Sequence, residues 1–256
     1  MSYWANKVVM ITGASSGIGR GLALELASRG ANLGLVARRQ DLLDEITSEV
    51  TARHVRAVSA TADVRDAKAV RAAADRFRNE LGLIDVLIAN AGIGTADHAL
   101  KLAPEHASEV IGINVLGAVN SVAAVAPEMV ARRQGRLVAI SSLAAYRGLP
   151  KSAAYCASKA ALTAYFESVR IDLRKTGVGV TIIYPGFIKT AITRGRAAKM
   201  PHLMELDYAV KKIVSAIEKE KNSYAFPWQL ATIVRSGLLM PAGLYDWIAE
   251  RNSFRE

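Results

Sequence analysis

Residues 7–19 read KVVMITGASSGIG and decide the fold class. The apolar run from Val8 to Ile11 has the length and composition of a buried strand. From Ile18 onward, Ile18, Leu22 and Leu26 recur every four residues, which places them on one stripe of a helix. The glycine-rich segment between the two patterns therefore predicts a strand, a tight turn and a helix in direct succession.

The glycine-rich turn has the physical properties of a phosphate-binding turn. Glycines permit close backbone approach to a pyrophosphate, and a helix start offers free N–H groups with a partial positive charge. The spacing Gly-x-x-x-Gly-x-Gly differs from the Gly-x-Gly-x-x-Gly fingerprint of dinucleotide sites, and the Lys-Ser/Thr ending of a P-loop is missing. Such a turn by itself is weak support for any ligand, and it argues against phosphoryl transfer.

The same alternation of short Val- and Ile-rich runs with longer helical patterns continues along the chain. The predicted strands lie near Lys7 to Ile11, Asn32 to Val36, Val55 to Ala60, Ile84 to Ala89, Arg136 to Ser141, Val178 to Tyr184 and Ser223 to Phe226. The predicted helices lie near Ile18 to Arg29, Gln40 to Ala52, Ala67 to Leu81, Pro104 to Arg132, Ala153 to Thr176 and Asp207 to Glu220. This order predicts an α/β fold with a doubly wound, seven-stranded parallel sheet, helices on both faces and ligand binding beyond the carboxyl ends of the strands.

Composition limits the class of protein. The chain has 256 residues, 51% of them hydrophobic and 22% charged, without repeats or Pro/Gly-rich linkers, so we expect one folded domain over residues 1–256. Cys156 is the only cysteine and the four histidines are scattered, so we expect no disulfide and no metal site. No secretory signal is visible, which favours the cytoplasm.

The net charge of +10 could indicate nucleic acid or anionic lipid as a partner. The basic residues are, however, spread over several segments, including 132–136, 194–199 and 211–221, without aromatics for base stacking. We therefore interpret most of the charge as solvated surface, with a small part serving an anionic cofactor, and expect no nucleic-acid partner.

The end of the second predicted strand indicates which dinucleotide is bound. The strand ends in Ala37, Arg38 and Arg39, where a site that prefers NAD usually presents an acid to the ribose hydroxyls. The guanidinium groups can pair with a 2′-phosphate, and Ala37 leaves room for it. This pattern favours NADP(H).

Tyr155 and Lys159 lie four residues apart in a helical stretch, so both side chains project from the same face. A phenol has an ordinary pKa of about 10, and a nearby ammonium makes its ionisation easier. Tyr155 would then act as the acid/base in hydride transfer between a nicotinamide and a carbonyl or alcohol. Ser142, just past a predicted strand, would donate to the substrate oxygen; Ser141 is the alternative, but strand alternation points neighbouring side chains in opposite directions.

These motifs occur together in the order of a known family. With TGASSGIG, Asp63-Val64, Asn90-Ala91-Gly92, Asn114, Ser142, Tyr155-x-x-x-Lys159 and Pro185-Gly186, the sequence resembles the short-chain dehydrogenase/reductase family over Lys7 to Thr190. The resemblance implies a single-domain Rossmann fold and a homo-oligomer, either dimer or tetramer. Ala89 departs from the family pattern, where many relatives carry a second asparagine.

The resemblance also implies roles for individual residues. Asn114 would kink its helix and hold a water in a proton relay to Lys159, completing a catalytic set with Ser142 and Tyr155. The implied cofactor contacts are Gly13, Ser15, Ser16, Gly17, Ile18 and Gly19 for pyrophosphate and ribose, Arg38 for the 2′-phosphate with Arg39 beside it, Asp63 and Val64 for adenine, Asn90, Ala91 and Gly92 for support, and Pro185, Gly186, Ile188 and Thr190 around the carboxamide, with Tyr155 and Lys159 also beside the cofactor.

The segment 224–256 has an apolar and aromatic face that Arg235 and Pro241 interrupt. No uninterrupted apolar run in it approaches the roughly 18 to 20 residues needed to span a bilayer. Three uses stay open: a lid over an apolar substrate, a subunit contact or a weak membrane-surface contact. The favoured function is an NADP(H)-dependent reductase of a fairly apolar ketone or aldehyde. The alternatives are a steroid or long-chain keto-lipid reductase at a membrane surface and, in another class, a dinucleotide-sensing scaffold without turnover.

Overall fold

The strands of this chain pair into one parallel sheet. The computed structural model describes residues 2–96, 98–190, 193 and 200–251, and within them seven strands follow the order β3-β2-β1-β4-β5-β6-β7. All six pairings are parallel. The strands are β1 (Val8–Thr12), β2 (Asn32–Ala37), β3 (Ala57–Thr61), β4 (Val86–Ala89), β5 (Gly135–Ile140), β6 (Val178–Pro185) and β7 (Ser223–Phe226). The predicted fold is confirmed.

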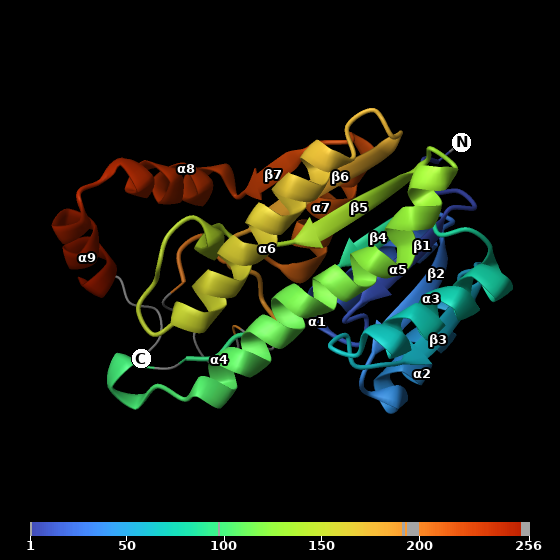
Figure 1. Cartoon of the computed structure of the whole chain (residues 1–256), viewed down its shortest axis with the longest axis horizontal. Helices are drawn as coiled ribbons and strands as arrows, with labels where there is room; N and C mark the ends of the chain where they lie inside the picture. Colours follow the sequence, from blue (N-terminus) through green and yellow to red (C-terminus); the bar gives the residue numbers. More distant parts are fainter. Residues whose placement is uncertain (1, 97, 191–192, 194–199, 252–256) are drawn as a thin grey trace.

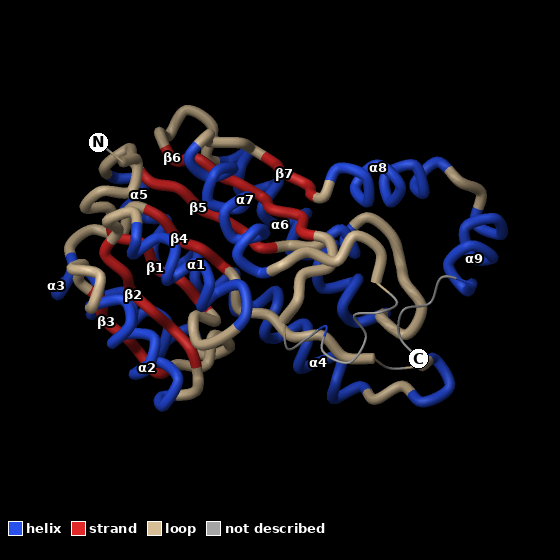
Figure 2. The backbone as a smooth tube through the Cα atoms, turned by 180° about the vertical axis from the view of Figure 1, so that it is seen from behind, coloured by secondary structure: helices blue, strands red, loops and turns tan. Residues whose placement is uncertain are grey.

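Helices cover both faces of the sheet. They are α1 (Gly17–Ser28), α2 (Gln40–Thr51), α3 (Ala67–Leu81), α4 (Pro104–Ile111), α5 (Gly117–Ala131), α6 (Ala153–Asp172), α7 (Leu206–Glu218), α8 (Trp228–Ser236) and α9 (Ala242–Arg251). One apolar core joins the sheet to α3, α5 and α6, which lie across the near face in Figure 1. A second core joins the opposite face to α1, α2 and α7, as Figure 2 shows. Strands buried between two such layers need no polar face, which explains why β1 is buried at every position.

The strand order reverses beside β1. The chain passes from β1 outward through β2 and β3, and then returns to β4 on the other side of β1. In open parallel sheets, the loops that follow the two strands at this point diverge and leave a crevice. The carboxyl ends of β1 and β4 are therefore the place to look for a ligand site.

The helix predicted from Pro104 to Arg132 is one continuous helical stretch, residues 104–131, which a π-helical turn, η2 (Gly112–Leu116), divides into α4 and α5. Other predicted boundaries were wrong. The helix predicted to end at Thr176 ends at Asp172, because the chain leaves the helix in a turn where Lys175 and Gly177 have positive φ angles of 70° and 85°. The strands predicted from Val55 and Ile84 begin two residues later, at Ala57 and Val86, where regular pairing with the neighbouring strands starts.

One continuous helical stretch, residues 104–131, is long and apolar enough to cross a membrane by length and composition alone. An 18-residue part of this stretch has a mean hydropathy of 1.7, and 56% of that part is buried inside the protein. Within this stretch, α5 packs against β4, β5 and α3. Its apolar composition is explained by this position in the core.

The chain segment after β7 leaves the body of the protein. In Figures 1 and 2, α8 and α9 extend away from the sheet, with the short 3-10 turn η6 (Gly237–Leu239) between them. No residue of α9 is buried. We call residues 228–251 the C-terminal arm; the part of the predicted apolar segment at 252–256, like the basic segment 194–199, lies outside the described residues.

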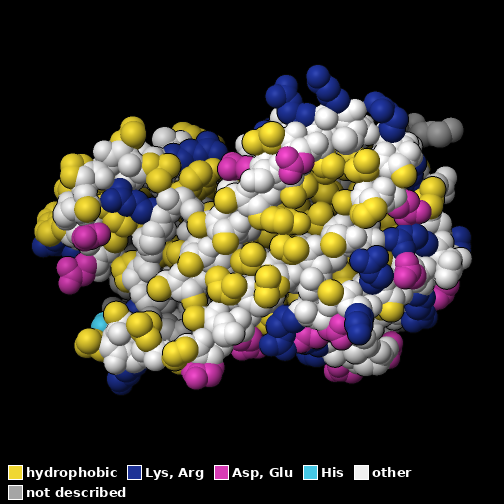
Figure 3. Space-filling view, viewed as in Figure 1, with side chains coloured by type: hydrophobic (Ala, Val, Ile, Leu, Met, Phe, Trp, Pro, Cys, Tyr) yellow, Lys and Arg dark blue, Asp and Glu magenta, His cyan; other side chains and the backbone are white. Residues whose placement is uncertain are grey.

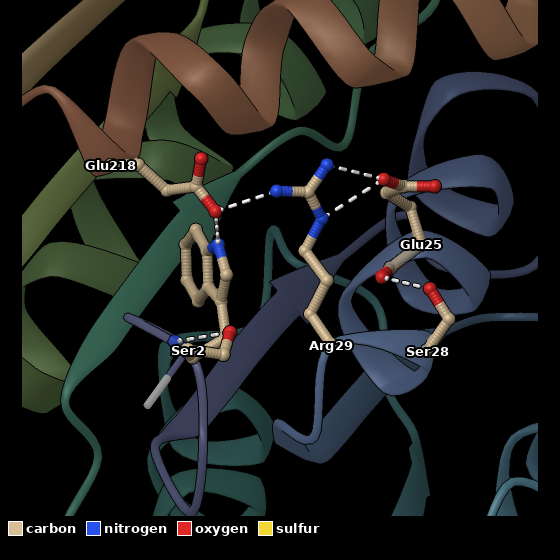
Figure 4. A network of polar contacts seen from close by, with 6 residues as sticks. Ser2, Glu25, Ser28, Arg29 and Glu218 are labelled. Atoms are coloured by element: carbon tan, nitrogen blue, oxygen red, sulfur yellow. Dashed lines mark hydrogen bonds and ion pairs between the residues drawn. The ribbon is translucent and has the colours of Figure 1, made fainter.

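A polar network fastens the N-terminal turn at the opposite end of the sheet (Figure 4). Glu218 of α7 accepts from the indole of Trp4 at 2.7 Å and from the guanidinium of Arg29 at 2.6 Å. Arg29 also donates to Glu25 of α1. The network ties α1 and α7 together far from the carboxyl ends of the strands, so its role is structural.

Candidate active site

The glycine-rich turn joins the carboxyl end of β1 to the start of α1. Gly13 and Gly17 have positive φ angles of 68° and 53°, a conformation that favours glycine. A Cβ on Gly13 would lie 2.8 Å from the Cα of Ala91, and one on Gly19 would overlap the carbonyl oxygen of Gly13. The turn therefore packs directly on the segment that follows β4, and larger residues would force the two apart.

Asn90 fastens that contact. Its side-chain Nδ2 donates to the main-chain oxygens of Thr12 and Gly13, at 2.9 and 3.2 Å. The main-chain N–H groups of Asn90 and Ala91 donate to the hydroxyl of Thr12, at 3.1 and 3.2 Å. The ends of β1 and β4 are thus held as one unit at the point where the strand order reverses.

A cavity of about 500 Å³ opens at this edge of the sheet. Most residues predicted to hold the cofactor line it: Gly13, Ser15, Ser16, Gly17, Ile18, Arg38, Arg39, Asp63, Val64, Asn90, Ala91, Gly92, Tyr155, Lys159 and Thr190. The other predicted residues are not among those that line it: Gly19, Asn114, Ser142, Pro185, Gly186 and Ile188. Residues from distant parts of the chain therefore converge on one space.

Tyr155 and Lys159 lie one turn apart on α6 and both line the cavity. The Lys159 side chain is buried, and its Nζ lies 5.8 Å from the centroid of the Tyr155 ring. Nζ donates to the carbonyl oxygen of Ile140, the last residue of β5, at 2.8 Å. Burial lowers the pKa of Lys159 to about 8, because the ammonium loses its hydration. A largely protonated amine is therefore held close to the phenol at neutral pH.

The two serines after β5 differ in exposure, and Ser141, not Ser142, is the one that lines the cavity. Ser141 is buried, and its hydroxyl contacts the carbonyl oxygen of Lys159 at 3.2 Å and the hydroxyl of Thr163 at 2.9 Å. Ser142 is partly exposed at the start of the turn η3 (Leu143–Ala145), where its Oγ accepts from the N–H of Ala144 at 3.1 Å. Because the Ser142 oxygen only accepts in this contact, its hydroxyl proton stays available to another acceptor. The Ser141 hydroxyl is already shared with the carbonyl oxygen of Lys159 and the hydroxyl of Thr163.

Asn114 lies within the π-helical turn and is fully buried. Its Oδ1 accepts from the N–H of Ile93 at 2.8 Å, and its Nδ2 donates to the carbonyl oxygen of Ile93 and the hydroxyl of Ser158, both at 2.9 Å. Ser158 directly precedes Lys159. The amide therefore joins the loop after β4 to α6, and the extra residue of a π turn is what lets the side chain reach both.

The sequence matches the short chain dehydrogenase family over residues 7–201. The chain belongs to this family. It is 43% identical over 251 residues to an uncharacterized oxidoreductase of Myxococcus xanthus, with 98% of each chain covered. The chain is therefore an oxidoreductase, and the resemblance inferred from its motifs is confirmed.

Solved structures of other short chain dehydrogenases share the fold of this one. A dehydrogenase from Burkholderia phymatum in complex with NAD is 25% identical with a TM-score of 0.84, over 92% of this chain and 94% of that one. An alcohol dehydrogenase from Thermococcus sibiricus complexed with 5-hydroxy-NADP is also 25% identical, with a TM-score of 0.78 over 86% and 95%. Similar frameworks thus accept either dinucleotide, so the choice depends on individual side chains.

In the present chain, two arginines, Arg38 and Arg39, lie at the end of β2 and line the cavity. Arg39 donates to the hydroxyls of Ser15 and Ser16, at 3.1 and 2.9 Å, and so lies over the glycine-rich turn. Arg38 is half exposed, and its guanidinium is 4.0 Å from the carboxylate of Glu109 on α4. At this distance and exposure, the attraction to Glu109 is weak, so Arg38 remains available to an anion in the cavity.

Arg65, which the sequence analysis did not single out, binds the cavity residue Asp63. Its guanidinium and its main-chain N–H both bind the carboxylate of Asp63, the guanidinium at 2.6 Å. These hydrogen bonds, with a smaller contribution from Arg38, hold the pKa of Asp63 below its usual range. Asp63 is therefore an ionised acceptor on the cavity wall. A motif search finds the aspartate but gives no reason to notice an arginine two positions later.

The segment after β6 reaches back to the glycine-rich turn. The N–H of Gly186 donates to the carbonyl oxygen of Phe226 at 2.7 Å, which fixes where the segment leaves the sheet. Ile188 is buried and forms an isolated bridge with Met204. Thr190 lines the cavity, and a Cβ on Gly17 would lie 3.6 Å from its methyl group. Among the described residues of this segment, only Thr190 lines the cavity.

The cavity walls fit a dinucleotide. A Cβ on Gly92 would lie 3.2 Å from Asn114 Oδ1 and 3.4 Å from Lys159 Nζ, so this wall has no space for a side chain. Three apolar residues that the motifs did not single out, Ile93, Ile113 and Ile140, also line the space. Backbone N–H groups at a helix start, two arginines, an ionised acceptor and an apolar wall together match the parts of a nicotinamide dinucleotide.

Proposed function

We propose that this short chain dehydrogenase is an NADP(H)-dependent reductase of a fairly apolar ketone or aldehyde. The observation that carries the cofactor choice is the end of β2, where Ala37, Arg38 and Arg39 line the cavity. An acid at this point would accept from the ribose hydroxyls of NAD(H), whereas two guanidinium groups favour a 2′-phosphate. The carboxylate of Glu109 is 4.0 Å from the guanidinium of Arg38, a weak pairing between two largely exposed groups.

The bound cofactor would supply a hydride to the carbonyl carbon of the substrate. Tyr155 would donate its phenolic proton to the carbonyl oxygen, and the ammonium of Lys159 would stabilise the phenolate that this leaves. Ser142 would hold the carbonyl oxygen by a hydrogen bond. Asn114 would act through position, since its three hydrogen bonds fix the loop after β4 and the turn of α6 that carries Lys159.

The apolar character of the substrate is inferred from the walls near Tyr155. Ile93, Ile113 and Ile140 line the cavity there, and a hydrophobic lining favours ligands whose non-reacting part is apolar. A steroid or a long-chain keto lipid is the alternative substrate class within the same activity. We also propose that the enzyme acts in the cytoplasm as a homo-oligomer.

Purified protein mixed with NADPH or NADH and a panel of ketones and aldehydes tests the activity. We expect loss of absorbance at the nicotinamide band with NADPH and an apolar carbonyl, and a higher kcat/KM with NADPH than with NADH. Tyr155→Phe is the control that should bind NADPH without turnover. Tight NADPH binding with no absorbance change across the whole panel would instead favour the dinucleotide-sensing scaffold.

A further inference from the structure

Arg147 contacts the C-terminal arm at three points. Arg147 donates to the carbonyl oxygens of Gly237 and Met240, the second at 3.1 Å, and its guanidinium carbon lies 3.9 Å from the centroid of the Tyr245 ring. These contacts fix both ends of the turn between α8 and α9. The arm therefore has a defined position although most of its side chains are exposed.

Two further bonds join the arm to the same loop. The hydroxyl of Tyr245 donates to the carbonyl oxygen of Gly148 at 2.5 Å, and Arg235 donates to the hydroxyl of Tyr146 at 2.9 Å. Residues 146–148 lie in the loop between Ser142 and Tyr155. The arm is thus attached to the segment that joins two predicted catalytic residues.

A groove of about 750 Å³ separates the arm from the short turn η1 (Ala99–Lys101). Residues 147–151 line it together with His98 and Ala99 on one side and Tyr245 and Ala249 on the other. The loop between Ser142 and Tyr155 therefore lines the groove, and α9 lies at the end of the protein toward which the strands point (Figure 1).

Large apolar side chains are exposed on the arm and on the segment that contains η1. Leu239, at the turn of the arm, is 90% exposed, Leu100 of η1 is 87% exposed, and Trp228 is 71% exposed. Other exposed apolar residues of the two segments are Leu102, Ile233, Leu238, Leu244 and Trp247. Figure 3 shows hydrophobic side chains over the arm and over the segment with η1, as well as across the middle of this face. Exposed apolar patches of this kind mark an interaction surface.

The distribution of charge on the arm favours an anionic partner. The arm contains two cations, Arg235 and Arg251, and two acids, Asp246 and Glu250, so its charges balance in number and only their placement differs. The two acids of α9, Asp246 and Glu250, line the groove. Cations accompany the exposed apolar residues instead.

Two of these cations lie directly beside exposed apolar side chains. The Arg251 guanidinium carbon is 3.7 Å from the centroid of the Trp247 ring, and Lys101 lies between Leu100 and Leu102. An aromatic ring with a cation against it suits the boundary between lipid headgroups and acyl chains.

We propose that the C-terminal arm and η1 together form a docking surface for an anionic lipid bilayer. A second copy of the chain that covered both segments would also cover the groove between them. A fluid bilayer covers both and still lets an apolar molecule pass into the groove. The inference concerns docking alone and stands without the proposed activity; if that activity holds, the bilayer is the source of its substrate.

Flotation with vesicles tests the docking surface. The full chain is mixed with vesicles of phosphatidylcholine and phosphatidylglycerol in equal parts, and with vesicles of phosphatidylcholine alone. We expect the wild type to float with the mixed vesicles, and the double variant Leu239→Asp, Trp247→Glu to lose at least about tenfold in partition coefficient. Ile171→Glu, an equally exposed apolar site at the other end of the protein, should bind like the wild type.

Two measurements keep the test independent of folding and of activity. NADPH affinity should be unchanged in the double variant, which shows that the sheet and the cavity are intact. Brominated lipid should quench the fluorescence of Trp228 and Trp247, whereas Trp4 is fully buried and stays bright. The proposal is overturned if the wild type does not float with anionic vesicles, if the double variant floats equally well, or if sedimentation shows that the double variant splits a dimer whose wild type ignores vesicles.

Discussion

The Nζ atom of Lys159 donates a hydrogen bond of 2.8 Å to the carbonyl oxygen of Ile140, which joins α6 to the end of β5. This bond places a buried ammonium beside the Tyr155 ring and restricts the rotation of its long side chain. Because the carbonyl belongs to the sheet, the position of the cation is set by the rigid part of the fold. The chemistry proposed for Tyr155 depends on that placement.

Tyr155→Phe should lower kcat by at least about a hundredfold, since the reaction loses its positioned acid. The dissociation constant for NADPH should stay close to that of the wild type, which fluorescence titration measures. Tyr165→Phe, on the same helix, is the matched control and should retain turnover. Near-normal kcat in Tyr155→Phe would show that another group moves the proton.

Arg38→Asp should move the ratio of kcat/KM for NADPH over NADH toward NADH by about a hundredfold, which is the effect of losing a charge-assisted hydrogen bond of about 3 kcal/mol. Steady-state kinetics with each cofactor measures the ratio. Arg53→Asp, at the exposed end of α2, makes the same charge change away from the cavity and should leave the ratio unchanged. If Arg38→Asp also leaves it unchanged, Arg39 becomes the residue that reads the phosphate.

Lys159→Met should change how stability depends on pH. Burial lowers the pKa of Lys159 to about 8 in the folded chain from the ordinary value of 10.5, so between these values the unfolded state binds the extra proton and wild-type stability rises with pH. Below pH 8 the buried charge costs the wild type about 3 kcal/mol of stability, from the pKa difference. Lys159→Met removes this cost but also loses the hydrogen bond to Ile140, which is worth about 1 kcal/mol.

The variant, measured without cofactor by urea unfolding, should therefore exceed the wild type in stability at pH 7 and lose most of that advantage by pH 10. Lys211→Met, an exposed lysine on α7, should leave the profile unaltered. A constant difference between wild type and Lys159→Met from pH 7 to pH 10 would contradict the assignment of the charge cost to Lys159.

Asn114→Ala should destabilise the fold by about 2 to 4 kcal/mol, because it leaves the N–H and carbonyl of Ile93 without their partner inside the protein. Chemical denaturation measures the change. Asn120→Ala removes two hydrogen bonds to main-chain oxygens from a more exposed amide on α5 and should cost about 1 kcal/mol. Equal losses in the two variants would mean that Asn114 has no special positioning role.

Most of the fold was predictable because it depends on local patterns. Buried parallel strands are short and continuously apolar, and amphipathic helices repeat their apolar residues with the helical period, so each element shows in its own sequence. The break at Gly112–Leu116 was not predicted from periodicity, because a π turn shifts the pattern by one residue and the segment stays apolar throughout. The arm helices α8 and α9 were missed as elements, since at 9 and 10 residues they are too short for the helical period to stand out.

The candidate site was predictable where residues act at fixed spacing along one element. The sequence by itself determined that Tyr155 and Lys159 share a helix face, that glycines occupy the turn after β1, and that no acid ends β2. Only the tertiary structure decided that Lys159 is held by Ile140, that Asn114 joins Ile93 to Ser158, and that Arg147 fastens the arm. These contacts join residues 19 to 93 positions apart through main-chain carbonyls and hydroxyls that every segment offers, so only the packing of the sheet and helices selects which of them meet.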